Sequence, residues 1–466
     1  MKKFKYIALL VAVLSLGACS YELKEKFDDN ATERITKAIA EYHNLLQSAP
    51  NGWIVYYFAD TQYGGYNLLL KFEKDSVTAW SELRQDSMQI DGKNYLYHET
   101  SHYRLLQSAG VVLSFDEYNN VIHKFSDPNS KIAEVGQDGE GYNGDHEWRV
   151  ISYENGVITL RGKKHNSRIE MVQAPASYPK LDENGNNVGE TPFSPEFYFD
   201  SLQTVILEMN SANVVTTVAG DSIKTTKNAD YNMFSFAVPQ ENGTTSNTDK
   251  PFVYKLDGIY LYSPLEINGH SITAFKYEPD KVKYYDIADP EVILHCLVLP
   301  INQQIVEKYW YINSEEDLGP YAGPIFRNTV NAIYESTGQT KGENCIWARI
   351  GSVYFTTGAP ASGFVYFCYN SGNYICQAQY SYELEGDETI TLKQWAPSTY
   401  AKTNSWTYYT EFGLGNCADV FKTTFDIQTN SVKAPRWVIL KDRNNAQNVI
   451  KLYISGLTYP FGRRED

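Results

Sequence analysis

The stretch Asn51-Gly52-Trp53-Ile54-Val55-Tyr56-Tyr57-Phe58 marks the point where a helical pattern gives way to a β pattern. Before it, apolar residues between Asn30 and Ala49 recur at helical spacing. After it, short runs rich in aromatic and β-branched residues alternate with turn dipeptides such as Asp91-Gly92 and Asn155-Gly156. These dipeptides tolerate the positive φ that tight hairpins require. The pattern predicts one N-terminal amphipathic helix followed by an antiparallel β meander.

The rest of the chain again shows a helical pattern followed by strand patterns, and its composition changes at two points. A polar stretch from Pro175 to Pro195 breaks the strand pattern, and a second helix is predicted over Phe197 to Met209. From about residue 335 the chain is rich in Gly, Ser, Thr and aromatic residues. We predict a mainly β protein with a few helices (α+β) in two or three β domains: a helix plus first β domain over 30–174, a linker over 175–195, a second β domain over 196–334 and a C-terminal β region over 335–466.

The first nineteen residues have the features of a bacterial lipoprotein signal. Three lysines among the first five residues precede the apolar run Ile7 to Leu16, which is too short to span a bilayer. The run ends in Leu16-Gly17-Ala18-Cys19, the pattern of a lipobox, in which the cysteine thiol receives a diacylglyceryl group. Ser20 fits sorting to the outer membrane. We expect a signal peptide over 1–18, lipidation of Cys19, an anchor linker over 19–29, and an outer-membrane protein on the periplasmic face or the cell surface.

Composition narrows the classes of partner. The formal net charge is -15, and it becomes more negative when the lysines of the signal are removed. This acidity argues against nucleic acid or anionic lipid surfaces as partners. The 37 tyrosines, 21 phenylalanines and 8 tryptophans favour strands and also supply flat surfaces for ligands.

The cysteines form an odd set once Cys19 is lipidated. In an oxidising compartment at least one of the other five stays unpaired within the chain. Cys368 and Cys376 flank a hairpin-like segment centred on Gly372, and symmetric pairing would place them opposite each other. We therefore predict a cross-strand disulfide between these two residues. The remaining cysteines are Cys296, Cys345 and Cys417.

His98-Glu99-Thr100-Ser101-His102 matches the HExxH signature of zinc proteases. That signature binds zinc when it lies on a helix, whereas the alternation of side-chain types around this segment predicts a strand. Two histidines four residues apart on a strand lie about 13 Å from each other, too far to share one zinc ion. We expect a solvated strand face at His98 and His102, with a metal site as the alternative.

Two further loop patterns favour ordinary turns. Gly139 to Gly144 satisfies GxGxxG but does not lie between a strand and a helix. The acidic and amide groups near Asp145, and those between Asp182 and Glu190, depart from the EF-hand spacing, so calcium is an alternative there. The sequence contains no GxSxG elbow, P-loop or paired-cysteine zinc motif, and we expect no cofactor and no catalytic residue.

The segment from Trp395 to Phe412 is the strongest candidate for ligand contact. Its aromatic residues are interleaved with Ser, Thr and Asn on predicted loops, a pattern that stacks on sugars or grips peptides. Packing against a β core is the alternative for about half of them. The candidate ligand-binding residues are Trp395, Tyr400, Trp406, Tyr408 and Tyr409.

Several motifs together resemble a family of Bacteroidetes lipoproteins known as domain of unknown function 4302. They are Asn51-Gly52-Trp53, Gly64-Gly65-Tyr66-Asn67, Gly144-Asp145-His146-Glu147-Trp148 and Asp257-Gly258-Ile259, and the resemblance is strongest over 51–171 and 252–280. It implies an accessory lipoprotein of a nutrient-uptake locus, beside a TonB-dependent transporter and its partner lipoprotein. No catalytic residues are established for that family, so none is transferred to this chain.

We therefore expect a non-enzymatic outer-membrane lipoprotein that binds or presents a nutrient, such as a glycan, a peptide or a cofactor, to a TonB-dependent transporter. The alternatives are an envelope hydrolase or zinc metalloprotease using residues 98–102, and a structural or adhesive surface protein.

Overall fold

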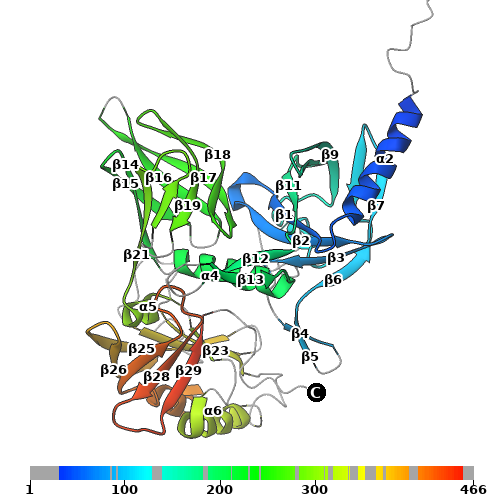
Figure 1. The fold of residues 1–466 in the computed structure, drawn as a ribbon. Coiled ribbons are helices and arrows are strands. Elements are labelled where there is room, and N and C mark those ends of the chain that lie inside the picture. Colours follow the sequence, from blue (N-terminus) through cyan, green and yellow to red (C-terminus); the bar gives the residue numbers. More distant parts are fainter. Residues whose placement is uncertain are drawn as a thin grey trace, which may run out of the picture.

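The computed structural model describes residues 31–83, 87–90, 93–128, 139–181, 187–210, 212–228, 231–240, 243–278, 283–308, 310–312, 318–333, 335, 345–351, 364–370, 374–397 and 408–454. Cys19 and the whole signal segment lie outside these ranges. The protein is mainly β with antiparallel sheets, as predicted, and is built from three β bodies in chain order (Figure 1). No helix within the described ranges is both long and apolar enough to cross a membrane.

The first body is a nine-stranded antiparallel sheet preceded by helix α2 (Ala31–Gln47). Strand β1 lies between β2 and β11, and its apolar residues are buried on both faces: Val55 belongs to the core of the first body, and Ile54 belongs to the cluster that includes α4 and the first barrel. Trp53 on β1 donates from its indole N–H to the carbonyl of Leu46, which fixes the end of α2 on the sheet. The strands in sheet order are β6 (Glu99–His102), β3 (Ser76–Ser81), β2 (Tyr66–Phe72), β1 (Trp53–Phe58), β11 (Arg168–Gln173), β10 (Val157–Gly162), β9 (Glu147–Glu154), β8 (Val111–Ser114) and β7 (Arg104–Gln107).

Short elements complete this body. The 3-10 turns η1 (Thr61–Tyr63) and η2 (His123–Phe125) lie in its loops, and β4 (Ser87–Ile90) pairs with β5 (Lys93–Leu96) in a separate hairpin. The segment predicted as a linker, 175–195, contains a second hairpin of β12 (Ser177–Leu181) and β13 (Asn187–Pro192). The polar composition of this segment fits the exposure of β13, and residues 177–181 and 187–192 form strands and not only a connection.

The second body is a closed barrel of eight consecutive strands, preceded by α4 (Pro195–Asn210). It closes because β21 pairs with β14, with Val298 opposite Ala212. Closure removes both sheet edges. The strands are β14 (Ala212–Val218), β15 (Asp221–Lys227), β16 (Met233–Pro239), β17 (Thr245–Lys255), β18 (Gly258–Ile267), β19 (His270–Glu278), β20 (Lys283–Asp286) and β21 (Val292–Val298).

The third body is another closed eight-stranded barrel, and it begins earlier than the predicted boundary at 335. Helices α5 (Ile301–Glu307) and α6 (Gly319–Ile333) bury their apolar residues in the core of this barrel and not in the preceding one. The break therefore falls near residue 300. The other elements are β22 (Trp310–Tyr311), β23 (Cys345–Gly351), β24 (Phe364–Asn370), β25 (Tyr374–Glu385), β26 (Thr389–Pro397), α9 (Leu414–Asp419), β27 (Thr424–Thr429), β28 (Trp437–Asp442) and β29 (Val449–Tyr453).

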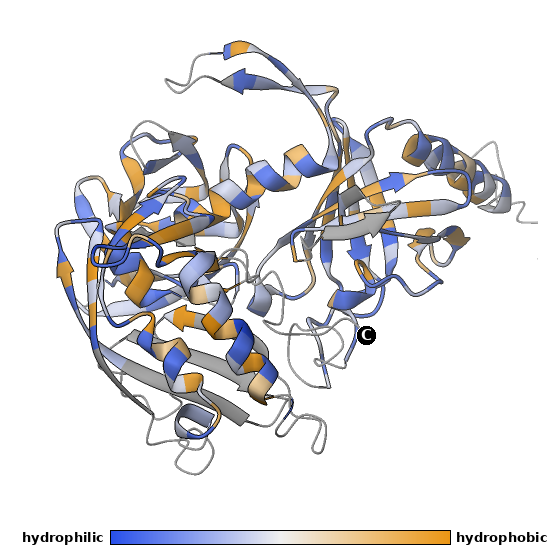
Figure 2. Cartoon of the chain, turned by 90° about the horizontal axis from the view of Figure 1, so that it is seen from below, coloured by the Kyte–Doolittle hydropathy of each residue, from blue (hydrophilic) through white to orange (hydrophobic). Residues whose placement is uncertain are grey.

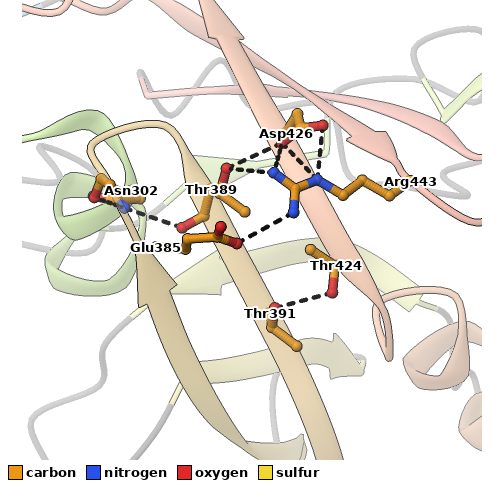
Figure 3. Close-up of polar contacts among 8 residues, drawn as sticks. Asn302, Glu385, Thr389, Thr391, Thr424, Asp426 and Arg443 are labelled. Atoms are coloured by element: carbon orange, nitrogen blue, oxygen red, sulfur yellow. Dashed lines mark hydrogen bonds and ion pairs between the residues drawn. The ribbon is translucent and has the colours of Figure 1, made fainter.

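A polar network holds neighbouring strands of the third body together (Figure 3). Arg443 donates to both carboxylate oxygens of Asp426 at 3.0 Å and to Glu385 at 3.2 Å, and so links β27 with the end of β25. Thr389 on β26 donates to Asp426 at 3.0 Å, and its carbonyl accepts from Asn302 of α5 at 3.0 Å. The charges of this network are paired with one another, which gives it a structural role.

Helix α4 lies between the two barrels in Figure 1. Its apolar residues, among them Leu202 and Val205, are buried in the core of the first barrel. On another side, Asp200 pairs with Arg436 of the second barrel, and the same guanidinium donates to Thr204 at 3.0 Å. Figure 2 shows apolar and polar residues alternating along the helices, as expected for helices that bury only one face.

Candidate ligand-binding site

An open groove lies between α6 and α9 on the second barrel. Its volume is about 370 Å³, within the range of small-molecule pockets. Four lining residues come from α6 at spacings that place them on one face of the helix, and three come from α9 and its C-terminal end. They are Tyr321, Ile325, Asn328, Thr329, Asn416, Asp419 and Val420.

The groove combines one exposed aromatic ring with several hydrogen-bonding groups. The side chain of Tyr321 is 38% exposed and is the only aromatic group among the lining residues. Asn328 and Asn416 each offer a carbonyl and an amide, and Asp419 offers a carboxylate. A ring beside such groups suits a sugar, whose apolar face stacks on the ring while its hydroxyl groups bond to amides and carboxylates.

The two helices that line the groove share a core. Phe326 and Val330 of α6 and Leu414 and Cys417 of α9 belong to the same buried cluster. Gly413, which precedes α9, has a φ of 79° that favours glycine, and its carbonyl accepts from Thr329 at 3.4 Å. The Cys417 thiol is free, and burial raises its pKa to about 12, so it stays protonated.

The predicted aromatic segment lies next to this groove in the chain but does not line it. Tyr408 and Tyr409 are only 5% and 3% exposed, and both belong to the core beneath α9. Their burial fits the packing alternative and gives them no access to a ligand in this structure. Trp395 lies on β26, where only its backbone is described, and Tyr400 and Trp406 lie outside the described residues.

Sequence reasoning missed the residues that do line the groove. Tyr321, Asn328 and Asn416 come from helices almost ninety residues apart, so no local motif joins them. The one indication of these residues in the sequence is the amphipathic pattern of α6, whose polar face carries residue types that can contact a ligand.

The HExxH segment lies on an edge strand, as the alternation predicted. Glu99 to His102 form β6, which pairs with β3, and His98 precedes it with its ring 5.4 Å from that of Trp80. Glu99 accepts hydrogen bonds from the main-chain N–H of Asn120 at 2.6 Å and from the Tyr97 hydroxyl, so its carboxylate anchors a loop. No cluster of three or more His, Cys, Asp or Glu side chains suited to a metal occurs in the described part of the chain.

The residues around Gly139 to Asp145 also serve the fold. The Asp145 carboxylate points inward and accepts from the main-chain N–H groups of Lys164 (2.8 Å) and His165 (3.0 Å) and from the hydroxyl of Ser167 (2.9 Å). A Cβ on Gly144 would come within 2.6 Å of the Tyr57 hydroxyl oxygen. These residues have a structural role, because the carboxylate oxygens of Asp145 already accept hydrogen bonds from N–H and O–H donors. In the second candidate calcium loop, residues 182–186 lie outside the described residues, and Glu190 lies on β13, where its carboxylate accepts from the hydroxyl of Ser177.

The strand register places Cys368 of β24 directly opposite Cys376 of β25. This is the arrangement that the hairpin pattern predicted for the backbone, while the disulfide itself stays a prediction. Cys296 is a free, buried thiol on β21.

These features define a class of protein: a multidomain, antiparallel β protein with an open groove in its C-terminal barrel. The chain belongs to the family described as domain of unknown function (DUF4302), which matches residues 24–279. That match spans the nine-stranded sheet and most of the first barrel, so the groove lies outside it.

Other comparisons add no argument about function. Two sliding clamps, the DNA polymerase III β subunits of Pseudomonas aeruginosa and Bartonella birtlesii LL-WM9, are 6% and 10% identical over 90% and 89% of this chain and 97% of theirs. The TM-score is 0.12 in both cases, so these likenesses carry no argument. The comparison with curated proteins found no match.

Proposed function

We propose that this protein is a lipid-anchored accessory protein of the outer membrane that binds a glycan in the α6/α9 groove and presents it to a TonB-dependent uptake system. The observation that carries the proposal is the groove itself, whose lining residues include Tyr321, Asn328, Asn416 and Asp419. The lipobox ending at Cys19 supplies the anchor.

The position of the groove supports presentation. In Figure 1, α2, the first described element after the anchor segment, lies at one end of the molecule and α6 at the other. A ligand in the groove is therefore held at the end remote from the start of α2. The acidic charge of the chain is compatible with an uncharged ligand and unfavourable for an anionic one.

We propose binding and not catalysis, because the groove is open and its lining residues carry an aromatic ring, amides and a carboxylate. The acidic side chain of the HExxH segment, Glu99, accepts a hydrogen bond from the main-chain N–H of Asn120 and so anchors a loop. The buried thiol nearest the groove, Cys417, is held in its protonated form.

The test is a glycan array followed by calorimetry on the purified chain, using the oligosaccharides that the array retains. Tyr321→Ala should weaken binding about 5-fold, because stacking on an exposed ring contributes on the order of 1 kcal/mol. Tyr382→Ala is the matched control, since Tyr382 is 37% exposed on β25 of the same barrel and does not line the groove. No retained glycan, or equal effects of both substitutions, would overturn the proposal.

The anchoring part is tested separately. Cys19→Ser should release the chain from the outer-membrane fraction, and a pulldown with the wild-type chain should recover a TonB-dependent transporter. A variant that stays in the membrane fraction contradicts lipidation at Cys19 without bearing on the groove.

A further inference from the structure

Three arginines form a row across neighbouring strands of the nine-stranded sheet. The strand register places Arg161 of β10 opposite Arg149 of β9 on one side and opposite Arg168 of β11 on the other. Residues directly opposite each other in a sheet point to the same face, with Cβ atoms about 4.5–5.5 Å apart. The register therefore places three guanidinium side chains on one face of the first body.

This face is turned away from the core of the first body. Each arginine has a neighbour in the chain, Trp148, Leu160 or Ile169, whose side chain is buried in that core. Successive side chains of a strand point to opposite faces, so the arginines point outward. The row begins where the first barrel meets the sheet, because Arg168 donates to the carbonyl of Tyr262 on β18 at 2.7 Å.

Two of the three arginines, Arg149 and Arg161, make no hydrogen bond or ion pair with any described residue. Both are half-buried, and the Nε atom of Arg149 is a buried donor without an acceptor among those residues. Buried polar groups nearly always have a partner, and like charges directly opposite each other destabilise a sheet. The two side chains therefore lack the counter-charge that their position requires.

The nearest carboxylates along these strands are already paired with other cations. Glu170 on β11 accepts from the Nε atom of Arg168 at 3.2 Å and from Nη2 at 2.7 Å. Glu147 on β9 accepts from the ammonium group of Lys163 at 3.0 and 3.1 Å. Two adjacent cations thus stay unmatched on this face, in a chain whose formal net charge is -15.

We propose that Arg149 and Arg161 bind a tetrahedral oxyanion, a phosphate or sulfate group, on this face of the sheet. A guanidinium group donates paired hydrogen bonds to such an anion, and two guanidinium groups match its two negative charges. The terminal nitrogens of Arg149, unlike its Nε atom, are not among the buried atoms, so an anion can reach them. The buried Nε atom shows that the side chain is packed against the sheet, which holds its guanidinium group in place.

This site is independent of the proposed glycan site. The arginines lie in the first body, within the residues that the family matches, whereas the groove lies in the second barrel. A free ion and the ester group of a larger ligand share the chemistry that the arginines recognise. The experiment therefore compares both sources, and its outcome does not depend on whether the groove binds a glycan.

The test is calorimetry on the purified full chain with inorganic phosphate, inorganic sulfate and glucose 6-phosphate, at constant ionic strength. One site per chain is expected. Arg149→Gln and Arg161→Gln should each weaken binding at least 10-fold, because each removes charge-assisted hydrogen bonds. Arg161→Lys should weaken it less, since lysine keeps the charge but loses the paired geometry. Arg327→Gln, at an exposed position on α6, is the matched control because it changes the net charge equally.

Thermal unfolding separates a binding role from a structural one. Arg161→Gln removes a contact between like charges, so without phosphate or sulfate it should melt at or above the temperature of the wild type. Phosphate should raise the melting temperature of the wild type and not that of this variant.

The relative affinities identify the source of the anion. Tighter binding of glucose 6-phosphate than of inorganic phosphate assigns the site to an esterified ligand, and the reverse order assigns it to the free ion. The proposal is overturned if the wild-type chain binds none of the three anions, if Arg161→Gln binds them as tightly as the wild type, or if Arg327→Gln loses as much affinity as Arg161→Gln.

Discussion

The carboxylate of Glu82 accepts two hydrogen bonds from Asn67, one from the main-chain N–H at 2.9 Å and one from the side-chain amide at 2.6 Å. The same amide of Asn67 donates to the carbonyl of Tyr254 in the first barrel at 3.0 Å, and Asn232 of that barrel donates to Glu82 at 3.2 Å. These contacts join the nine-stranded sheet to the barrel. Burial at this joint raises the pKa of Glu82 to about 7, although the hydrogen bonds and nearby Lys227 favour the charged form.

We predict that this joint weakens as the pH rises. The pKa of Glu82 is higher in the folded protein than its unfolded value of 4.5, so the folded state binds the proton more tightly. The stabilising contribution is complete below pH 4.5 and is lost as the pH rises toward 7, by up to about 3 kcal/mol. Urea unfolding between pH 4 and 8 measures it, and Glu82→Gln should remove this part of the pH dependence. Glu154→Gln, at an exposed position, is the control; identical profiles for the wild type and Glu82→Gln would contradict the prediction.

We predict that Asp145→Ala destabilises the first body by about 3 kcal/mol or more. The substitution leaves the N–H groups of Lys164 and His165 and the hydroxyl of Ser167 without their acceptor. Thermal unfolding followed by circular dichroism measures the loss. Asp116→Ala, which removes an exposed ion pair with Arg104, should cost no more than about 1 kcal/mol. Equal effects of the two substitutions would argue against the buried role of Asp145.

We predict that His98 and His102 do not hold zinc. The strand geometry separates the two rings, and His98 packs against Trp80. Metal analysis by mass spectrometry should find the same zinc content in the wild type and in His98→Ala. A stoichiometric zinc ion that disappears in this variant, together with peptidase activity, would instead support the metalloprotease alternative.

We predict a disulfide between Cys368 and Cys376. Their strands pair in the register that places the two residues opposite each other. Peptide mapping without reduction should recover a cross-linked peptide, and reduction should cost about 2.5 kcal/mol for a loop of this length. Recovery of both thiols in alkylated form from protein purified without reductant would show that the disulfide does not form.

Local patterns predicted the elements that depend on near neighbours. The helix over Ala31–Gln47, the helix over Pro195–Asn210 and the strand at Glu99–His102 follow from spacing alone. The register of Cys368 and Cys376 was also predictable, because a hairpin joins residues only eight positions apart. In the structure the third body begins near residue 300 and not at 335. The pattern of α6 indicates that this helix has a buried face, but it does not indicate which barrel covers that face.

The sequence by itself determined that this chain is a mainly β protein with a lipobox-like start, because alternation and turn residues act over a few positions. Only the tertiary structure decided what the polar residues do. Asn67 meets Glu82 and Tyr254, and Met209 meets Cys296, through contacts between separate elements, and Tyr321 and Asn416 line one groove from two helices. Such contacts depend on barrel closure and helix docking. Chain spacing encodes neither, because residues far apart in sequence have no fixed separation until the fold forms.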